Sequence, residues 1–425
     1  MTTTKNNEHK KLNFPNEQEQ SQACLNSAEH EKNQGRKVLN VPNLRFKEFQ
    51  GEWEKTKFGD IATGFDYGMN AAAKNYDGVN KYIRITDIDE ASSTYTDKDI
   101  VSPDGVLTDN YLVNNRDILL ARTGASTGKS YLYKKSDGKL YYAGFLIRAN
   151  VTTHDPYFVF SQLHTHRYWR WVSIMSARSG QPGINSQEYS SFPIYTTSIE
   201  EESKIAKLLS LLDERIATQN KIIEDLKKLK SAIIEIEYTP NTKTTSHIGN
   251  VIEQISKRNK NNAIQNVLSV SNRQGFIKQS DQFENRNVAS EDTSNYKIVE
   301  KNDFAFNPAR INVGSIARLT TFEKGIVSPM YICFRTQENV APEYIDFFFE
   351  SKHFYCEIQK RLEGSVRQCL SFEGLCNIPF SLPSLEMQQR IGKRLFILGQ
   401  KIKTETDLLE LLNKQKQYLL RQMFI

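Results

Sequence analysis

The sequence repeats itself at a constant distance, and this repeat limits what the chain can fold into more than any other feature. Asp117 corresponds to Asp303, and 303 − 117 = 186. A period of that length is a whole domain, since solenoid repeats have periods of roughly 20 to 50 residues. The sequence therefore predicts one module that is folded twice. The same difference of 186 relates Gly128 to Gly314, Pro156 to Pro342, Ile184 to Leu370, Pro193 to Pro379 and Ile205 to Ile391.

Each module is predicted to end in a long helix. Residues 198–236 contain neither Gly nor Pro, and their apolar residues recur in steps of four and three, which is the seam pattern of a coiled coil. A polar interruption of this seam at Gln219 recurs at Glu405. The predicted seam consists of Ile205, Leu209, Leu212, Ile216, Ile223 and Leu226 in the first helix and of Ile391, Leu395, Leu398, Ile402, Leu409 and Leu412 in the second.

The rest of each module is predicted to contain both strands and helices. Short runs such as residues 80–89 and 116–122 are typical of strands bounded by turns, and residues 156–175 have the length of a single helix. The predicted fold class is α+β, with two pseudo-repeated mixed α/β domains separated by two long helices. The expected division is a disordered polar tail at 1–40, a first domain at 41–197, a helix at 198–237, a second domain at 238–383 and a C-terminal helix at 384–425.

Charge and composition exclude some classes of protein. The chain has 56 Lys and Arg against 50 Asp and Glu, a net charge of +6, which suits an acidic partner only where basic side chains gather locally. No stretch approaches the roughly 18 apolar residues of a membrane span, so a membrane protein is excluded. The N-terminus lacks an apolar signal core and the 5 cysteines include no CxxC pair, so we expect a cytoplasmic protein.

Three short motifs fall short of catalytic or ligand-binding patterns. The run at 124–130 has three residues between its glycines where a phosphate-binding loop needs four, and a strand-like segment follows it, so a glycine-rich hairpin is expected. The run NPAR at 307–310 lacks the aromatic residue that would stack on a flipped base. His164 and His166 have no acidic or Cys partner nearby and are expected to be surface or packing residues. We therefore expect no catalytic residue, no metal ligand and no cofactor bound by this chain.

Side chains suited to nucleic acid gather in the predicted loops of both domains. Arg can contact guanine with two hydrogen bonds, Asn and Gln can do the same with adenine, and Lys and Ser hold phosphates. Dispersed polar surface residues would give a similar pattern, so each assignment is a hypothesis. The candidate DNA-binding residues are Tyr67, Asn70, Lys74, Arg84, Arg122, Lys129, Arg178 and Gln181 in the first domain and Ser271, Arg273, Arg310, Arg367 and Gln368 in the second.

Several segments resemble one known protein family. RDILLARTGASTGKS at 116–130, SGQPGIN at 179–185 and SIEEESKIAKLLSLLDERI at 198–216 are similar to the specificity subunits of type I restriction-modification enzymes. The second half repeats this resemblance with VLSVSNRQGFIKQ at 267–279 and SLEMQQRIGKRLFILGQKI at 384–402. The similar runs at the start of the two long helices, at 198–216 and 384–402, and the duplication of the module together make the resemblance specific.

The resemblance implies two target-recognition domains, each reading one half of a bipartite, asymmetric site in double-stranded DNA. It also implies that the two helices form an antiparallel coiled coil, which spaces the domains and docks two methyltransferase (modification) subunits. Those partners would carry S-adenosylmethionine, and separate restriction/translocase subunits would use ATP and Mg²⁺. This chain would be the non-catalytic reader of the sequence.

Two other classes of function are alternatives. A self-contained DNA methyltransferase or nuclease of a fused restriction system would need a cofactor loop and a catalytic cluster, and the sequence shows neither. A coiled-coil scaffold that binds only protein would leave the loops rich in Arg, Lys and Gln without a role. The residues therefore favour a DNA-binding specificity subunit.

Overall fold

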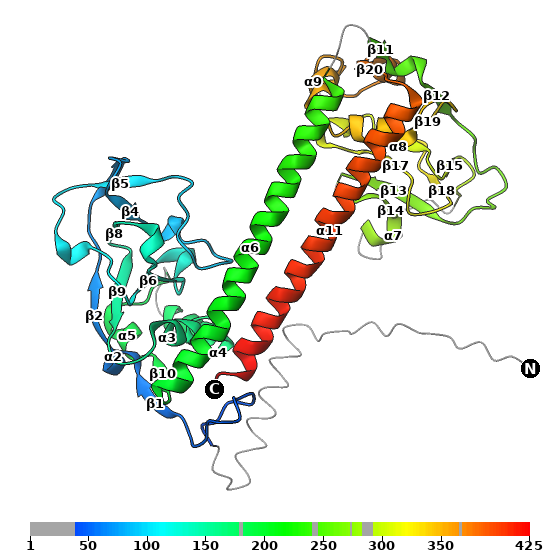
Figure 1. Ribbon diagram of the computed structural model, residues 1–425. Helices are drawn as coiled ribbons and strands as arrows, with labels where there is room; N and C mark the ends of the chain where they lie inside the picture. The colour runs from blue at the N-terminus through cyan, green and yellow to red at the C-terminus, as the bar shows by residue number, and fades with distance from the viewer. Residues whose placement is uncertain (1–38, 178–181, 240–244, 273, 283–291, 365–367) are drawn as a thin grey trace, which may run out of the picture. The chain divides into compact units, whose positions relative to one another are not determined.

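The computed structural model describes residues 39–177, 182–239, 245–272, 274–282, 292–364 and 368–425 (Figure 1). Most of the tail expected at 1–40 lies outside these ranges. The described residues form two compact units, one containing 39–213 with 414–425 and the other lying between 214 and 413. We call them unit 1 and unit 2. The expected division treated the long helices as separate segments, whereas here each long helix is divided between the units.

Unit 1 is built around an antiparallel sheet of four strands in the order β2-β9-β6-β7. Helices pack on this sheet, and Phe158, Tyr168 and Tyr189 are fully buried in the shared core. The strands are β1 (Glu54–Lys57), β2 (Ala62–Tyr67), β3 (Ala72–Asn75), β4 (Lys81–Ile83), β5 (Val101–Asp104), β6 (Asp117–Ala121), β7 (Ser130–Leu132), β8 (Leu140–Tyr142), β9 (Leu146–Val151) and β10 (Pro193–Thr196), and the short helices are α2 (Phe58–Ile61), α3 (Pro156–Gln162), α4 (His166–Ser176) and α5 (Ser186–Ser190).

Unit 2 repeats this sheet with the order β12-β19-β16-β17, so the repeat predicted from the sequence is also a repeat of topology. Unit 2 also contains a second sheet of four strands, in the order β14-β13-β18-β15. The strands are β11 (Thr245–His247), β12 (Ile252–Ile255), β13 (Val267–Ser271), β14 (Gly275–Lys278), β15 (Lys297–Glu300), β16 (Phe304–Phe306), β17 (Ile316–Arg318), β18 (Lys324–Val327), β19 (Ile332–Thr336) and β20 (Pro379–Ser381), and the short helices are α7 (Gln279–Gln282), α8 (Pro342–Phe348), α9 (Lys352–Gln359) and α10 (Phe372–Cys376).

The turn before the central strand shows how closely the two units match. Asp117 accepts a hydrogen bond from the backbone N–H of Asn114 at 2.6 Å, and Asp303 accepts the same bond from Glu300 at 2.7 Å. The residue before each Asp has a positive φ, 72° at Arg116 and 70° at Asn302. Burial raises the pKa of both carboxyls. These carboxylates therefore close equivalent turns in the two units.

The segment predicted as one helix at 156–175 forms two. Helix α3 ends at Gln162, and Thr165 caps the start of α4 by accepting a hydrogen bond from the N–H of Tyr168. The Thr165 hydroxyl also donates to the carbonyl of Gln162 at 2.8 Å. Ser351 caps α9 in the same way in unit 2. A short polar side chain that bonds the local backbone thus interrupts the helix, although the aromatic pattern continues.

The two long helices are α6 (Ile199–Tyr238) and α11 (Leu385–Gln422), and they begin 186 residues apart (385 − 199). Within unit 2 they run antiparallel. Gln219 Nε2 donates to the carbonyl of Glu405 at 3.0 Å, and farther along α6, Glu237 lies 3.4 Å from Arg394, which precedes Glu405 on α11. Gln219 and Glu405 are equivalent positions of the repeat, so the polar interruptions of the two predicted seams meet each other.

None of the predicted seam residues is exposed. The first positions of each seam belong to the core of a globular module, since Ile205 and Leu209 pack in the core of unit 1 and Ile391 and Leu395 in that of unit 2. The coiled-coil geometry remains a prediction. Buried are Ile205, Leu209, Leu212, Ile223, Ile391, Leu395 and Leu412, and partly buried are Ile216, Leu226, Leu398, Ile402 and Leu409.

Candidate nucleic-acid interface

In each unit, two loops that carry candidate DNA-binding residues are held side by side by an equivalent backbone hydrogen bond. In unit 1 the N–H of Ile184 donates to the carbonyl of Arg122 at 2.9 Å. In unit 2 the N–H of Leu370 donates to the carbonyl of Pro308 at 3.0 Å. The donors are 186 residues apart (370 − 184), and so are the acceptors (308 − 122). We call this arrangement the loop pair of each unit.

Arg122 and Tyr67 lie together at the loop pair of unit 1. The guanidinium carbon of Arg122 lies 4.6 Å from the centre of the Tyr67 ring, and the hydroxyl of Tyr67 accepts a hydrogen bond from the N–H of Ser186 at 3.3 Å. The exposed Phe145 is the next neighbour, because its carbonyl accepts from the N–H of Arg122 at 3.0 Å. An aromatic ring and a cation are thus presented together, a combination that can stack on bases and hold phosphates.

A glycine-rich hairpin supports this cluster, as the sequence predicted. Strands β6 and β7 pair antiparallel, and Gly128 turns the chain with a φ of 93°. A side chain at Gly128 would collide with Val172 and Trp169, whose atoms lie within 3.0 Å of the position of a Cβ. The buried Tyr189 holds the hairpin from the core side, since its hydroxyl donates to the carbonyl of Ala121 at 2.6 Å.

The other candidate DNA-binding residues of unit 1 differ in their exposure and in whether a carboxylate pairs with them. Asn70 is exposed, and Lys74 on β3 lies 3.8 Å from Asp104. Lys129 lies 3.1 Å from Glu90 and is mostly covered. The guanidinium of Arg84 is already paired within the protein, because it forms hydrogen bonds and ion pairs with Asp87 and with Asp99. These carboxylates, Asp87 more than Asp99, raise the pKa of Arg84. Arg178 and Gln181 lie outside the described residues.

Unit 2 presents fewer of its candidates in the described ranges. The side chain of Arg310 is exposed, beside the buried Asn307, whose Oδ1 accepts from the N–H of Ala309 at 3.1 Å. Gln368 is exposed next to Cys369, which exchanges two backbone hydrogen bonds of 2.9 Å with Glu363. Ser271 ends β13 and is half-buried. Arg273 and Arg367 lie outside the described residues.

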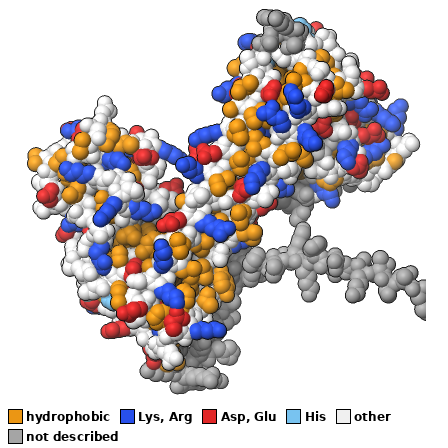
Figure 2. Space-filling view, in the orientation of Figure 1, with side chains coloured by type: hydrophobic (Ala, Val, Ile, Leu, Met, Phe, Trp, Pro, Cys, Tyr) orange, Lys and Arg blue, Asp and Glu red, His pale blue; other side chains and the backbone are white. Residues whose placement is uncertain are grey.

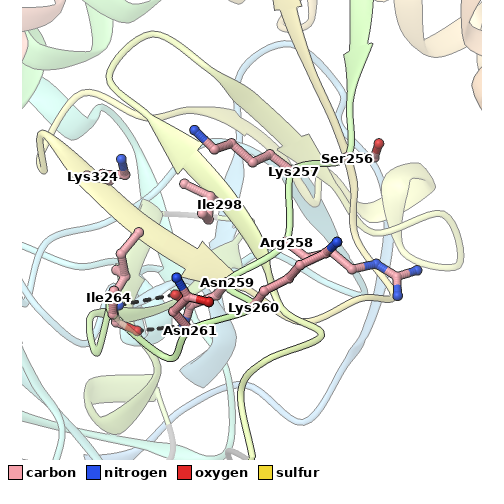
Figure 3. Close-up of a pocket in the computed structure, with 10 residues that line it drawn as sticks. Ser256, Lys257, Arg258, Asn259, Lys260, Asn261, Ile264, Ile298 and Lys324 are labelled. Carbon is pink, nitrogen blue, oxygen red and sulfur yellow. Dashed lines mark hydrogen bonds between the residues drawn. The ribbon is translucent and has the colours of Figure 1, made fainter.

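The structure also gathers a group of cations that the sequence analysis did not single out. Lys257, Arg258 and Lys260 follow strand β12 and line a cavity of about 770 Å³ together with Lys324 from strand β18 (Figure 3). The run KRNK at 257–260 was visible as local charge in the sequence. The approach of Lys324 was not, because β18 lies more than sixty residues farther along the chain (324 − 260 = 64).

Positive and negative side chains are mixed on the face of the molecule that Figure 2 shows. In the described part of the chain, no group of three or more His, Cys, Asp and Glu residues is placed to hold a metal ion. His164 is used in packing, with its ring nitrogens 2.9 Å from the carbonyl of Phe160 and 2.9 Å from the hydroxyl of Ser93. No helix among the described residues is long and apolar enough to cross a bilayer.

Comparison with known proteins gives consistent results. The family model described as "Type I restriction modification DNA specificity domain" matches residues 50–228 and again residues 234–414. The chain is 24% identical over 414 residues to the type I restriction enzyme MjaVIII specificity subunit of Methanocaldococcus jannaschii, over 88% of this chain and 92% of that protein. It is 24% identical over 419 residues to the putative MjaX specificity subunit of the same organism, over 90% and 93% of the two chains.

The fold is also similar to that of a solved structure. The S subunit of a type I restriction-modification system from M. genitalium aligns with a TM-score of 0.58 over 91% of this chain and 99% of that chain. The two sequences are 15% identical, so this likeness concerns the fold alone.

Proposed function

The chain belongs to the type I restriction modification DNA specificity family, whose model matches it twice, and from this premise we propose that each unit reads one half of a bipartite, asymmetric DNA site. The chain is thus a specificity subunit with two recognition domains, and catalysis lies in partner subunits. We place it in the cytoplasm, bound to double-stranded DNA in complex with two modification subunits and with restriction/translocase subunits. S-adenosylmethionine would be held by the modification subunits, and ATP and Mg²⁺ by the motor subunits.

The loop pair is the observation that supports this proposal most. Both units hold two loops together with the same hydrogen bond, yet the side chains at the loop pair differ. Unit 1 has Arg122, with Tyr67 from the end of β2 beside it, and unit 2 has Arg310 and Gln368. A common frame with different side chains suits two related readers of different base sequences. Because base-edge contacts depend on the identity of the side chain, the two half-sites should differ.

The partner would dock on the long helices. In unit 2, Ile222, Leu229 and Ile236 follow one another at intervals of seven residues on α6 and are 39%, 50% and 76% exposed. Figure 2 shows hydrophobic side chains at the surface along these helices. A stripe of exposed apolar residues with a heptad spacing suits packing against helices of another protein.

Mapping of methylated bases tests the reading function. Cells that express the chain with a modification subunit should carry methylated adenine in one split motif, and cells without the chain should lack it. Replacing residues 41–197 with the equivalent segment of a related chain should change one half of the motif and keep the other. If both halves change together, independent reading is wrong.

Co-purification tests the docking surface. The double variant Ile222→Asp with Leu229→Asp should lose a tagged modification subunit, because charges in an apolar interface are costly to desolvate. The matched control, Asn220→Asp with Lys227→Asp, adds acidic residues on the same helix at exposed polar positions and should still co-purify. Equal retention of the modification subunit by both variants would contradict docking on this stripe.

A further inference from the structure

We infer that the cationic cavity formed by Lys257, Arg258, Lys260 and Lys324 binds phosphodiester groups of the DNA backbone next to the half-site that unit 2 reads. This inference rests on the proposed function and adds a site to it. The cavity contributes affinity without sequence preference, and it is separate from the loop pair that carries Arg310 and Gln368.

The loop that carries three of these cations is fixed by a buried side chain. Asn259 is 2% exposed, its Nδ2 donates to the carbonyl of Ile264 at 2.9 Å, and its Oδ1 accepts from the N–H of Ile264 at 3.1 Å. Asn262, at the turn of the loop, has a positive φ of 49° and accepts a hydrogen bond from the hydroxyl of Thr293 at 3.1 Å. The loop is therefore closed on itself, as the dashed lines of Figure 3 show for Asn259.

The same segment is also attached to the sheet beside it. The N–H of Ile298 on β15 donates to the carbonyl of Lys257 at 2.8 Å, and the N–H of Asn259 donates to the carbonyl of Tyr296 at 3.0 Å. The residue between them, Arg258, forms a β-bridge with Lys297. The backbone of residues 257–259 is thus paired with residues 296–298, and this pairing fixes the positions from which the side chains of Lys257 and Arg258 extend.

The cations that line the cavity outnumber the carboxylates paired with them, so the net charge there is positive. Among the described residues, Lys257 and Lys260 have no carboxylate within ion-pair distance, and both are exposed. Arg258 donates to the neutral Asn295 at 3.1 Å and so keeps its charge uncompensated. Glu300 lies 2.9 Å from Lys324 and offsets that one amine. Lys324 and Lys257 both help to lower the pKa of Glu300.

This composition favours a phosphate ligand over a base edge. Three of the four cations are Lys, a compact point charge that suits phosphate, whereas reading a base requires groups with fixed donor and acceptor directions. Of the lining residues that could contact a base edge, Arg258 is hydrogen-bonded to Asn295 and Asn259 to Ile264, and Asn261 is exposed. The residues that line the cavity include no carboxylate, which could accept from cytosine, and no aromatic ring on which a base could stack. In the view of Figure 3 the amines of Lys257 and Lys324 lie on one side of Ile298, and the side chains of Arg258 and Lys260 extend on the other.

The salt dependence of DNA binding tests the inference. The complex of the chain with its modification subunits is titrated with a fluorescent duplex, once with the methylated motif and once without it, over a series of KCl concentrations. The double variant Lys257→Gln with Lys260→Gln should bind both duplexes more weakly by a similar factor, on the order of tenfold at low salt. The slope of log K against log [KCl] should become shallower by about 0.9 for each phosphate contact that is lost.

A control variant separates the site from overall charge. Lys301→Gln with Lys352→Gln removes two exposed amines of unit 2 that do not line the cavity, and it should leave the slope nearly unchanged. An equal loss in both variants would overturn the inference, and so would a change in the methylated motif of the Lys257 and Lys260 variant. Loss of ATP binding measured by calorimetry in that variant would assign the cavity to a free nucleotide instead. If the unaltered complex fails to retain either duplex, the proposed function itself is wrong.

Discussion

At the scale of single residues, the first turn of each long helix is locked to its globular module by one buried side chain. Glu202 is fully buried and accepts hydrogen bonds from the N–H of Asp155 at 3.0 Å, from the N–H of Thr197 at 3.1 Å and from His154 at 2.9 Å. Its equivalent, Gln388, accepts from the N–H of Ala341 at 3.0 Å. The partners Asp155 and Ala341 are again 186 residues apart (341 − 155).

Removing Glu202 should therefore destabilise unit 1 strongly. Glu202→Ala leaves several buried donors without an acceptor, and each costs about 1 to 3 kcal/mol, so we expect a loss of at least about 3 kcal/mol. Gln388→Ala should cost unit 2 less, because Gln388 accepts only one of these bonds. All 3 tryptophans, at positions 53, 169 and 171, lie in unit 1, so urea unfolding followed by tryptophan fluorescence measures this loss. An unchanged midpoint for Glu202→Ala would contradict the role of the lock.

His164 should make the stability of unit 1 depend on pH. Burial, with a smaller effect of Lys416, lowers the pKa of His164 from its ordinary 6.5 to about 4. The unfolded chain takes up a proton near pH 6.5 while the folded one does so only near pH 4, so the free energy of unfolding falls as the pH drops between these values. The loss is at most about 3 kcal/mol.

The variant His164→Gln isolates this effect, since it keeps a polar side chain without the titration. Its free energy of unfolding, measured by tryptophan fluorescence from pH 7 to pH 4, should fall less steeply than that of the unaltered chain. Parallel curves for the two proteins would show that His164 does not control the acid sensitivity.

At the scale of elements, each long helix starts in the core of one unit and ends in the core of the other. Tyr238, at the end of α6, donates to the carbonyl of Tyr344 at 2.6 Å in unit 2. Phe424, just after α11, packs in unit 1 with ring centres 6.1 Å from Trp53 and 5.4 Å from Phe158. Unit 1 thus combines two segments that are far apart in the sequence, 39–213 and 414–425, whereas unit 2 is continuous between 214 and 413.

Phe424→Ala should therefore destabilise unit 1, although residue 424 lies next to the C-terminus. Truncating a buried Phe costs about 3 to 5 kcal/mol, because contacts are lost and a cavity remains. The loss of the ring beside Trp53 should also shift the fluorescence of the folded protein. Tyr418→Ala, at a position on α11 that is 58% exposed, is the control and should change the unfolding free energy by less than about 0.5 kcal/mol. Similar unfolding midpoints for the two variants would refute the packing argument.

At the scale of the whole molecule, the two helices connect two readers, and we expect their length to set the spacing between the half-sites. The facing pair Gln219 and Glu405 marks the same level on both helices. Insertions after these two residues therefore lengthen both helices at the same level.

Four residues inserted at each point should lengthen the spacer of the methylated motif by one or two base pairs. They add about 6 Å of helix and a rotation of about 40°, close to the rise and twist of that much DNA. Seven residues add about 10 Å, near three base pairs and 100° of DNA twist, while the seam rotates by only about 20°, so methylation should be weak on every spacer. Motif mapping from genomic DNA of cells with each variant gives the spacers. An active four-residue variant with an unchanged spacer would show that the helices do not set this distance.

The sequence alone determined the features that depend on local pattern. The constant offset predicted the duplicated module. The absence of Gly and Pro from residues 198–236 predicted the first long helix, and the repeated apolar seam predicted the second. The spacing of the glycines predicted a hairpin at 124–130 in place of a phosphate-binding loop. These features could be predicted because periodicity and backbone preference act over neighbouring residues.

Only the tertiary structure decided which distant residues meet. It placed Arg122 over Tyr67, and it brought Lys324 to the loop at 257–260. It also returned the C-terminus to the core of unit 1. None of these contacts follows from a local pattern. Each joins residues that are far apart in the sequence and that meet only when the whole unit folds. The candidate site was therefore predictable as a set of residue types, and its geometry was decided by the fold.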